Sequence, residues 1–187
     1  MPKKLQKIPN KSQLKLRKTL SAQGLLKTAR NEFEKIPEHR GGAVKYSLSD
    51  VLMSALAMFG LKYSSLLQFD KARNEKTIKA NLKELYGVEQ APCDTQMREV
   101  LDPVNPEALR PAFVSIHRQL QRQKVLEDYQ YLRGYLVSVD GTGQFTSNNI
   151  SCEDCCSRTR RNGEKQYYHQ LLGVVISHPD KPNVLPG

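Results

Sequence analysis

The run Tyr135-Leu-Val-Ser-Val-Asp140-Gly-Thr-Gly143 joins an apolar, strand-like segment to a carboxylate that is followed by glycines. The wider segment Tyr129–Val139 is rich in Tyr, Leu and Val, which favour strands. The glycines allow a tight backbone turn and the close approach of another backbone. We therefore expect a buried strand that ends at Asp140 and delivers its carboxylate into a turn.

A second strand candidate follows after a long polar excursion. Gln166–Ile176 reads QYYHQLLGVVI, and about 25 residues, several of them cysteines, separate it from the first run. Two apolar runs bounded by turn-forming residues are typical of paired strands. The sequence therefore predicts a long β-hairpin with a decorated loop.

Asp140 is open to two interpretations. In the first, it binds Mg²⁺, which prefers hard oxygen ligands and is held by one or two carboxylates plus substrate phosphate. Two such ions activate the attacking oxygen and stabilise the leaving oxygen in phosphoryl transfer. In the second, Asp-Gly is a common hairpin-turn dipeptide and has no catalytic role. Because the next strand candidate begins only at Gln166, a simple turn explains the segment less well.

The sequence Cys152-Glu-Asp-Cys155-Cys156 is a possible zinc-binding segment. A Cys-x-x-Cys spacing lets two thiolates reach one Zn²⁺, and a tetrahedral site needs two further ligands. Cys156 and His169 are the nearby candidates, although adjacent Cys155 and Cys156 would not easily bind the same ion. The alternative is a set of surface thiols. Cys93 stands alone and is expected to be a small buried residue.

The loop between the two strand candidates is basic. If the hairpin forms, this loop should lie close to Asp140, which would suit a substrate with a phosphate backbone. An ordinary exposed loop explains the same residues equally well. The cations concerned are Arg158, Arg160, Arg161 and Lys165.

The charge of the chain is concentrated at its N-terminus. The 187 residues carry a net charge of +10, and the first 40 hold 11 Lys and Arg against 3 Asp and Glu. A cationic segment attracts polyanions, of which nucleic acid is the usual one. Lys15, Arg17 and Lys18 are therefore candidates for DNA contact, and a solvated terminus is the alternative.

No segment of the sequence is expected to cross a membrane. The longest apolar stretch, 48–61, is interrupted by polar residues and is shorter than the roughly 20 residues that a span requires. The N-terminus lacks the apolar core of a signal peptide. We expect a cytoplasmic protein, nucleoid-associated when bound to DNA, in which cysteines are reduced thiols or metal ligands.

Helical periodicity dominates the residues before Asp128. The segment VLMSALAMFGL at 51–61 is apolar nearly all round, which is typical of a core helix, and Ser47 and Asp50 have the spacing of a capping box before it. Asn105-Pro106-Glu107 is a strong helix start. The patterns predict helices over 12–36, 51–61, 62–86, 95–101 and 105–124.

The short helix that Asp94 or Thr95 would cap has two interpretations. Thr95, Gln96 and Arg98 near its start would suit the reading helix of a helix-turn-helix. A plain connecting helix in a bundle is the alternative. The sequence as a whole predicts an α+β chain, with a disordered basic arm at 1–11, a helical DNA-binding region at 12–127 and a β-containing region at 128–187.

Several motifs together resemble the IS4-like DDE class of insertion-sequence transposases. The resemblance covers the chain from about residue 15 onward. Its later motifs are Asp140-Gly-Thr-Gly143, the Cys-x-x-Cys loop, Tyr167-Tyr-His-Gln-Leu-Leu-Gly173 and His178-Pro-Asp180 with Val184-Leu-Pro186. Its earlier motifs are the helical stretch at 49–59 and the segment at 94–102.

The resemblance implies a ribonuclease-H-like catalytic domain preceded by a helical DNA-binding region. It implies an Asp, Asp and Glu active site that binds two Mg²⁺ or Mn²⁺ ions, at which water and then a DNA 3′-hydroxyl attack phosphodiesters in line. Asp140 matches the first of these carboxylates. The implied partners are DNA at the terminal inverted repeats of an insertion element and, in one possible assembly, a second copy of the chain.

The sequence departs from the family pattern after its second strand. The second Asp is expected on a later strand and the Glu on a later helix, and Asp180 matches neither position. We therefore expect the N-terminal portion of a transposase, with the first hairpin of a truncated ribonuclease-H-like α/β domain and no catalysis by the chain alone. A stand-alone DNA-binding regulator or inhibitor of transposition is the alternative, and a small zinc module around Cys152 and Cys155 is a third hypothesis.

Overall fold

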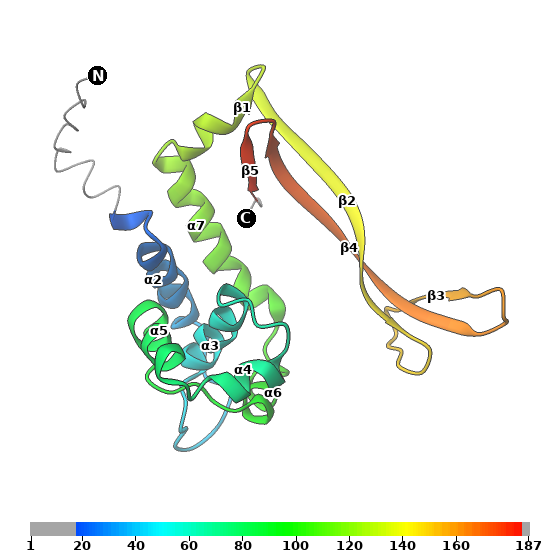
Figure 1. The fold of residues 1–187 in the computed structure, drawn as a ribbon, viewed down its shortest axis with the longest axis horizontal. Coiled ribbons are helices and arrows are strands. Elements are labelled where there is room, and N and C mark those ends of the chain that lie inside the picture. Colours follow the sequence, from blue (N-terminus) through cyan, green and yellow to red (C-terminus); the bar gives the residue numbers. More distant parts are fainter. Residues whose placement is uncertain (1–17, 185–187) are drawn as a thin grey trace. The chain divides into compact units, whose positions relative to one another are not determined.

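The computed structural model describes residues 18–184, except the side chains of residues 144–145 and 181–184. Lys15 and Arg17, and the expected helix start at 12–17, lie outside the described residues. The chain divides into two compact units between Gln123 and Lys124. The first is helical and the second is an antiparallel sheet, so the fold class is α+β (Figure 1).

The helical unit is built around α2 and α3. Helix α2 packs against α7, α5 and α3, and helix α3 also packs against α6 and α5. The helices are α2 (Ala22–Phe33), α3 (Leu48–Gly60), α4 (Leu66–Ala72), α5 (Lys76–Tyr86), α6 (Asp94–Leu101) and α7 (Arg110–Arg122), with the 3₁₀ turn η1 (Pro106–Leu109) leading into α7.

Helix α3 is the core helix that its apolar sequence predicts. Ser47 caps it by accepting a hydrogen bond from the Asp50 amide at 3.1 Å. Seven of its residues are buried, and Val51 and Ala57 are completely inaccessible to water. Burial on several faces of one helix removes a large apolar area from water, which makes α3 the main hydrophobic contribution to this unit.

Two expected helices are broken where polar side chains provide new caps. Helix α2 begins at Ala22, because the Ser21 hydroxyl accepts from the Gly24 amide at 3.1 Å. A side chain at Gly24 would collide with the Lys18 carbonyl, so this close approach requires glycine. The expected helix at 62–86 is instead α4 and α5, and Ser65 caps α4 through the Gln68 amide.

Arg30 ties three helices of this unit together. Its guanidinium donates to the Asp50 carboxylate at 2.9 Å, to the Tyr86 carbonyl at 3.1 Å and to the Gly87 carbonyl at 2.9 Å. The Asp50 carboxylate therefore bonds to α2, whereas the capping box predicted that it would cap its own helix. Gly87 ends α5 with φ = +66°, a left-handed conformation that favours glycine.

The second unit is a five-stranded antiparallel sheet with the order β1-β2-β4-β3, and β5 also pairs with β4. Its elements are the 3₁₀ helix η2 (Val125–Tyr129) and the strands β1 (Gln130–Tyr131), β2 (Gly134–Ser147), β3 (Cys156–Thr159), β4 (Lys165–His178) and β5 (Lys181–Val184). The predicted pairing of the two long runs is confirmed, since β2 and β4 are antiparallel from Leu136 opposite Ser177 to Ser147 opposite Tyr167.

The predicted strand end at Asp140 is wrong. Strand β2 continues through Asp140 to Ser147, and Asp140 lies opposite Gly173 in the middle of the ladder. Gly141 and Gly143 do not turn the chain, because each is paired with a residue of β4. The register between the two strands shifts by one residue at a bulge between Gly143 and Phe145.

The strand is also less buried than its sequence predicts. Val137 is 48% exposed and Val139 is 58% exposed, whereas Ile176 and Leu126 are buried. A long two-stranded ribbon has few neighbours to cover its faces, so apolar side chains remain accessible along it.

Glu38 generates a prediction about acid stability. Its carboxylate accepts from Arg40 Nε and Nη2, both at 2.7 Å, and from the Leu48 amide at 3.1 Å. The hydrogen bonds from Arg40 lower the pKa of Glu38 from 4.5 to about 2. The stabilisation is therefore complete above about pH 4.5 and is lost as the pH falls towards 2.

We expect Glu38→Gln to lower the free energy of unfolding by about 1 kcal/mol at neutral pH, a value reduced by solvent screening of this partly exposed pair. The difference from wild type should vanish near pH 2. Urea unfolding followed by circular dichroism across this pH range measures it, and Glu84→Gln on the exposed side of α5 is the matched control. A loss of stability that does not change with pH would contradict the assignment.

Candidate functional site

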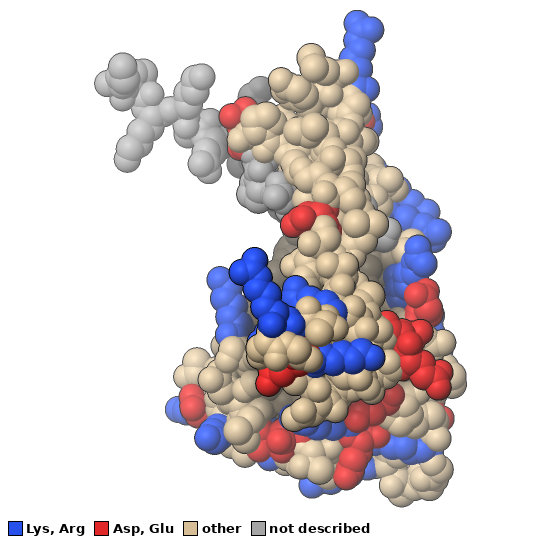
Figure 2. All heavy atoms as spheres, turned by 90° about the vertical axis from the view of Figure 1, so that its right-hand side faces the viewer, with Lys and Arg blue, Asp and Glu red and all other residues tan. Residues whose placement is uncertain are grey.

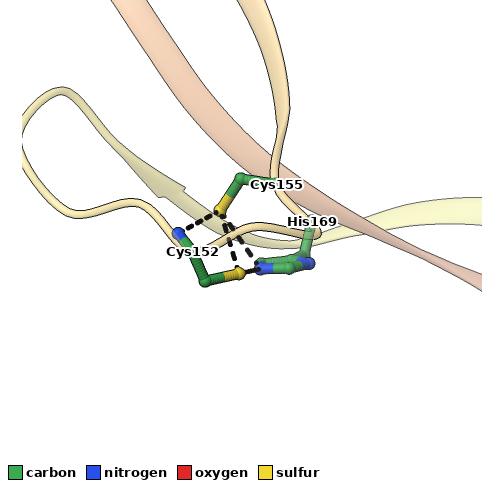
Figure 3. Close-up of side chains that lie close together, drawn as sticks. All are labelled: Cys152, Cys155 and His169. Atoms are coloured by element: carbon green, nitrogen blue, oxygen red, sulfur yellow. Dashed lines mark hydrogen bonds between the residues drawn. The ribbon is translucent and has the colours of Figure 1, made fainter.

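Strand alternation places His169 on one face of β4 and Tyr168 on the other. The segment between β2 and β3, residues 148–155, folds back so that Cys152 and Cys155 meet His169 (Figure 3). These are three of the four residues that the sequence offered as zinc ligands. In the described part of the chain, they form the one group of three or more Cys, His, Asp or Glu side chains close enough to share a metal ion.

The three donor atoms form a nearly equilateral triangle. Cys152 Sγ lies 3.5 Å from Cys155 Sγ, and His169 Nε2 lies 3.2 Å from Cys152 Sγ and 3.3 Å from Cys155 Sγ. For zinc–ligand bonds of about 2.3 Å to sulfur and about 2.0 Å to nitrogen, tetrahedral ligands lie about 3.8 Å apart for two sulfurs and about 3.5 Å for sulfur and nitrogen. The triangle therefore needs to expand by only a few tenths of an ångström to become one face of a tetrahedron.

The backbone around the cysteines holds them in this arrangement. The Cys155 amide donates to the Cys152 carbonyl at 3.2 Å, which closes a turn, and the Cys152 amide donates to Cys155 Sγ at 3.2 Å. Amide donors to sulfur support a thiolate ligand from outside the coordination shell. The hydrogen bond with the Cys155 thiol raises the pKa of Cys152.

The other two cysteines lie outside this group. Cys156 begins β3, is exposed and stands opposite Tyr168, so it does not share the face of His169. Cys93 precedes α6 and is half-buried rather than fully buried, with its sulfur 3.5 Å from Gln96 Oε1. Cys156 therefore provides a natural control for experiments on Cys152 and Cys155.

A basic surface lies at the β3–β4 end of the hairpin. Arg158 donates from Nε and Nη2 to Gln166 Oε1, at 2.9 and 2.6 Å, and its guanidinium lies 5.5 Å from the centre of the Tyr168 ring. Lys165 lies over Tyr167 at 5.1 Å. These contacts hold two cations in place against aromatic rings, a support that the sequence analysis missed. Lys165 stands two residues before Tyr167 and therefore on the same face of β4, which was a signal in the sequence that could have found one of these contacts.

Arg160 and Arg161 extend this basic surface into the turn. The Arg160 amide donates to the Glu164 carbonyl at 2.9 Å, and Gly163 has φ = +84°, which closes the turn and leaves both arginines exposed. We call Arg158, Arg160, Arg161 and Lys165 the basic end of the hairpin. Figure 2, which looks onto the side where β3 lies, shows a group of Lys and Arg side chains facing the viewer.

The expected closeness of this basic end to Asp140 is wrong. Asp140 lies opposite Gly173, which is eight residues along β4 from Lys165. At about 3.3 Å per residue, the two positions are about 26 Å apart along the strand. The distance follows from the straight continuation of β2 past its glycines, where the sequence analysis expected a turn.

Asp140 itself is exposed on the same face of the ribbon as Ser138, whose hydroxyl bonds to that of Ser177 at 2.9 Å. Side chains added at Gly141 or Gly143 would meet open space, so the backbone beside Asp140 is accessible. In the described residues, Asp140 belongs to no group of three or more candidate metal ligands. Asp140 therefore offers a metal ion one carboxylate ligand, with open space beside it.

The remaining candidate DNA contacts lie in the helical unit. Lys18 and Arg98 are both exposed, the latter on α6 beside exposed Thr95. Helix α6 packs against α3 and α4 through buried Met97 and Val100, which orients its polar side outward. This orientation is compatible with a reading helix and equally with a connecting helix.

Comparisons with known proteins leave the chain without an assigned family. The sequence matches no protein-family model and no curated protein, and the structure matches no solved structure. Over residues 18–184, no helix has the length and apolar composition to cross a lipid bilayer.

Proposed function

We propose that this chain acts in DNA transposition, as the DNA-binding and first-carboxylate part of an IS4-like DDE transposase. Asp140 is the metal-binding carboxylate, and the basic end of the hairpin contacts the DNA backbone. The observation that carries the proposal is the position of Asp140, exposed in the middle of a long antiparallel ribbon that follows a helical unit.

The surroundings of Asp140 fit a metal ligand that also approaches DNA. Its opposite neighbour is Gly173, which has no side chain to cover the carboxylate, and Gly141 beside it leaves the backbone open. Mg²⁺ is a hard cation that one or two carboxylates bind together with substrate phosphate. Asp140 would hold such an ion, which neutralises phosphate charge and polarises the phosphodiester when bound.

The positive charge at the hairpin end fits the same partner. Arg158 and Lys165 are held against tyrosine rings, and Arg160 and Arg161 project from the turn. Phosphate contacts of this kind position a protein on DNA without reading its sequence. The ribonuclease-H-like fold that the resemblance implies belongs to this proposal, as do the terminal repeats as the DNA target.

The role of Asp140 is tested by removing its charge and measuring DNA affinity with and without Mg²⁺. Without divalent metal, a carboxylate next to phosphate repels it, so Asp140→Asn should bind a fluorescent duplex about fivefold more tightly than wild type. With Mg²⁺ present, wild type should gain affinity through the shared ion and the advantage of the variant should disappear. Fluorescence anisotropy of the full chain, in EDTA and in Mg²⁺, measures both affinities.

The control for this experiment is Asp180→Asn. Asp180 is an exposed aspartate of the same unit and carries the same charge. Its substitution removes the same total charge and should change affinity equally in both conditions. If Asp140→Asn and Asp180→Asn behave alike in EDTA and in Mg²⁺, Asp140 does not bind metal next to DNA.

The basic end is tested by the salt dependence of binding. Each neutralised phosphate contributes about 0.9 to the slope of log K against log salt concentration. Arg161→Gln should therefore weaken binding to duplexes of different sequence alike and lower this slope by about 1. Arg133→Gln removes the same charge near the β1–β2 turn and should leave the slope unchanged. Equal slopes for the two variants would exclude the hairpin end from the DNA interface.

A second function is a DNA-binding regulator or inhibitor of transposition. The observation that favours it is that, in the part of the chain described, no group of three or more candidate ligands includes Asp140. The N-terminal cations would then supply much of the affinity. Replacing Lys15, Arg17 and Lys18 together by Gln should lower the salt slope by about 3 if each contacts a phosphate. An unchanged slope would exclude them, and cleavage of plasmid DNA in Mg²⁺ or Mn²⁺ that Asp140→Asn abolishes would exclude a purely regulatory role.

A further inference from the structure

We propose that Cys152, Cys155 and His169 bind one Zn²⁺ ion that fixes the start of β3 and thereby the basic end of the hairpin. The ion replaces the two thiol protons, which pass to solvent, and forms bonds to two sulfurs and one imidazole nitrogen. The metal site stands on its own geometry; its consequence for DNA binding rests on the proposed function.

The donor set and its spacing fit zinc better than the hard cations. Thiolate and imidazole are the ligands that Zn²⁺ prefers, whereas Mg²⁺ and Ca²⁺ select oxygen. The three donor atoms already lie 3.2, 3.3 and 3.5 Å apart, so the chain has placed them before any ion arrives. Cys152 is exposed and Cys155 and His169 are half-buried, which leaves the fourth tetrahedral position on the solvent side for water.

The local structure is of the kind that a metal ion stabilises. Residues 148–155 contain no regular secondary structure, and Ile150 is 66% exposed, so they lack a hydrophobic core. The Ser147 hydroxyl accepts from the Asn149 and Ile150 amides, at 3.2 and 3.0 Å, which holds the beginning of this segment. Small segments without a core commonly depend on a metal ion or disulfide for their order.

The position of Cys155 links the ion to the basic end. Cys155 immediately precedes Cys156, the first residue of β3, and β3 has only four residues. Arg158 lies on that short strand, and Arg160 and Arg161 follow it. A zinc ion bound to both Cys155 and His169 therefore links the N-terminal end of β3 to β4. The turn at Gly163 links the C-terminal end of β3 to β4.

The first experiment measures metal in the full chain. The protein, purified without a histidine tag, should contain about one zinc ion per chain. Cys155→Ser and His169→Gln should each reduce the content at least about tenfold, because the removal of one of three ligands leaves a weak site. Cys156→Ser removes a neighbouring exposed thiol that lies outside the triangle, and should leave the content unchanged.

Cobalt substitution tests the ligands and the geometry directly. Co²⁺ added to the metal-free protein should give the intense visible bands of tetrahedral cobalt and a near-ultraviolet band from sulfur-to-metal charge transfer. At the cobalt concentration that saturates wild type, the ultraviolet band should be largely lost in Cys155→Ser, whose weakened site stays mostly empty, and should stay unchanged in Cys156→Ser. Circular dichroism of each variant checks that the helical unit remains folded.

Hydrogen exchange tests the structural consequence separately from DNA binding. Zinc should slow exchange of amides in residues 152–159 by about tenfold in wild type and in Cys156→Ser, and have no effect in Cys155→Ser. If zinc binds and slows this exchange but DNA affinity is the same with and without it, the metal site stands and the link to DNA fails.

Three results would overturn the metal site. They are the absence of zinc or cobalt binding by wild type, an equal loss of binding in Cys156→Ser, and a Cys152–Cys155 disulfide as the stable form in reducing buffer. Thiol titration and intact mass, which falls by two hydrogens when a disulfide forms, distinguish the last result from the first. Binding of metal with unchanged hydrogen exchange would overturn the role in fixing β3.

Discussion

The register between β2 and β4 is the constraint on which the candidate sites depend. Because side chains alternate across a strand, the pairing of Asp140 with Gly173 and of Ser147 with Tyr167 decides which residues share a face. It leaves the Asp140 carboxylate uncovered, and it turns His169 towards the cysteines and Tyr168 towards Arg158. The metal triangle and the Arg158–Tyr168 contact are thus neighbours along one strand that occupy opposite faces of it.

The helical unit depends on different physics. Its stability comes from the burial of α3 and from Arg30, whose guanidinium satisfies the Asp50 carboxylate and two carbonyls at the end of α5. A charge that bonds to three partners in one place fixes the relative positions of the helices more strictly than apolar contact alone. The two units therefore combine a packed core with an extended ribbon whose order comes from pairing and from a few polar contacts.

The sequence predicted the features that follow from local patterns. The all-round apolar character of 51–61 predicted the core helix, and the two runs at 129–139 and 166–176 predicted the paired strands. The Cys-x-x-Cys spacing together with His169 predicted a side-chain group that the structure does assemble. The continuation of β2 past Asp140 could not be predicted, because Asp-Gly favours a turn and only the partner strand keeps it extended. The helix starts at Ala22 and Leu66 depend on serine caps and, at Ala22, on one close backbone approach, which periodicity does not register.

The bulge between Gly143 and Phe145 sets the parity of the hairpin. Before it, even-numbered residues of β2 lie opposite odd-numbered residues of β4; after it, odd residues lie opposite odd ones. Ser147, which starts the cysteine segment, therefore leaves the strand on the face of His169. In an unbulged ladder, Ser147 would stand opposite Gln166, and the cysteines would start from the face of Arg158. One unpaired residue in β2 thus changes which of its side chains share the face of His169 beyond the bulge. The facing of Asp140, which lies before the bulge, is unaffected.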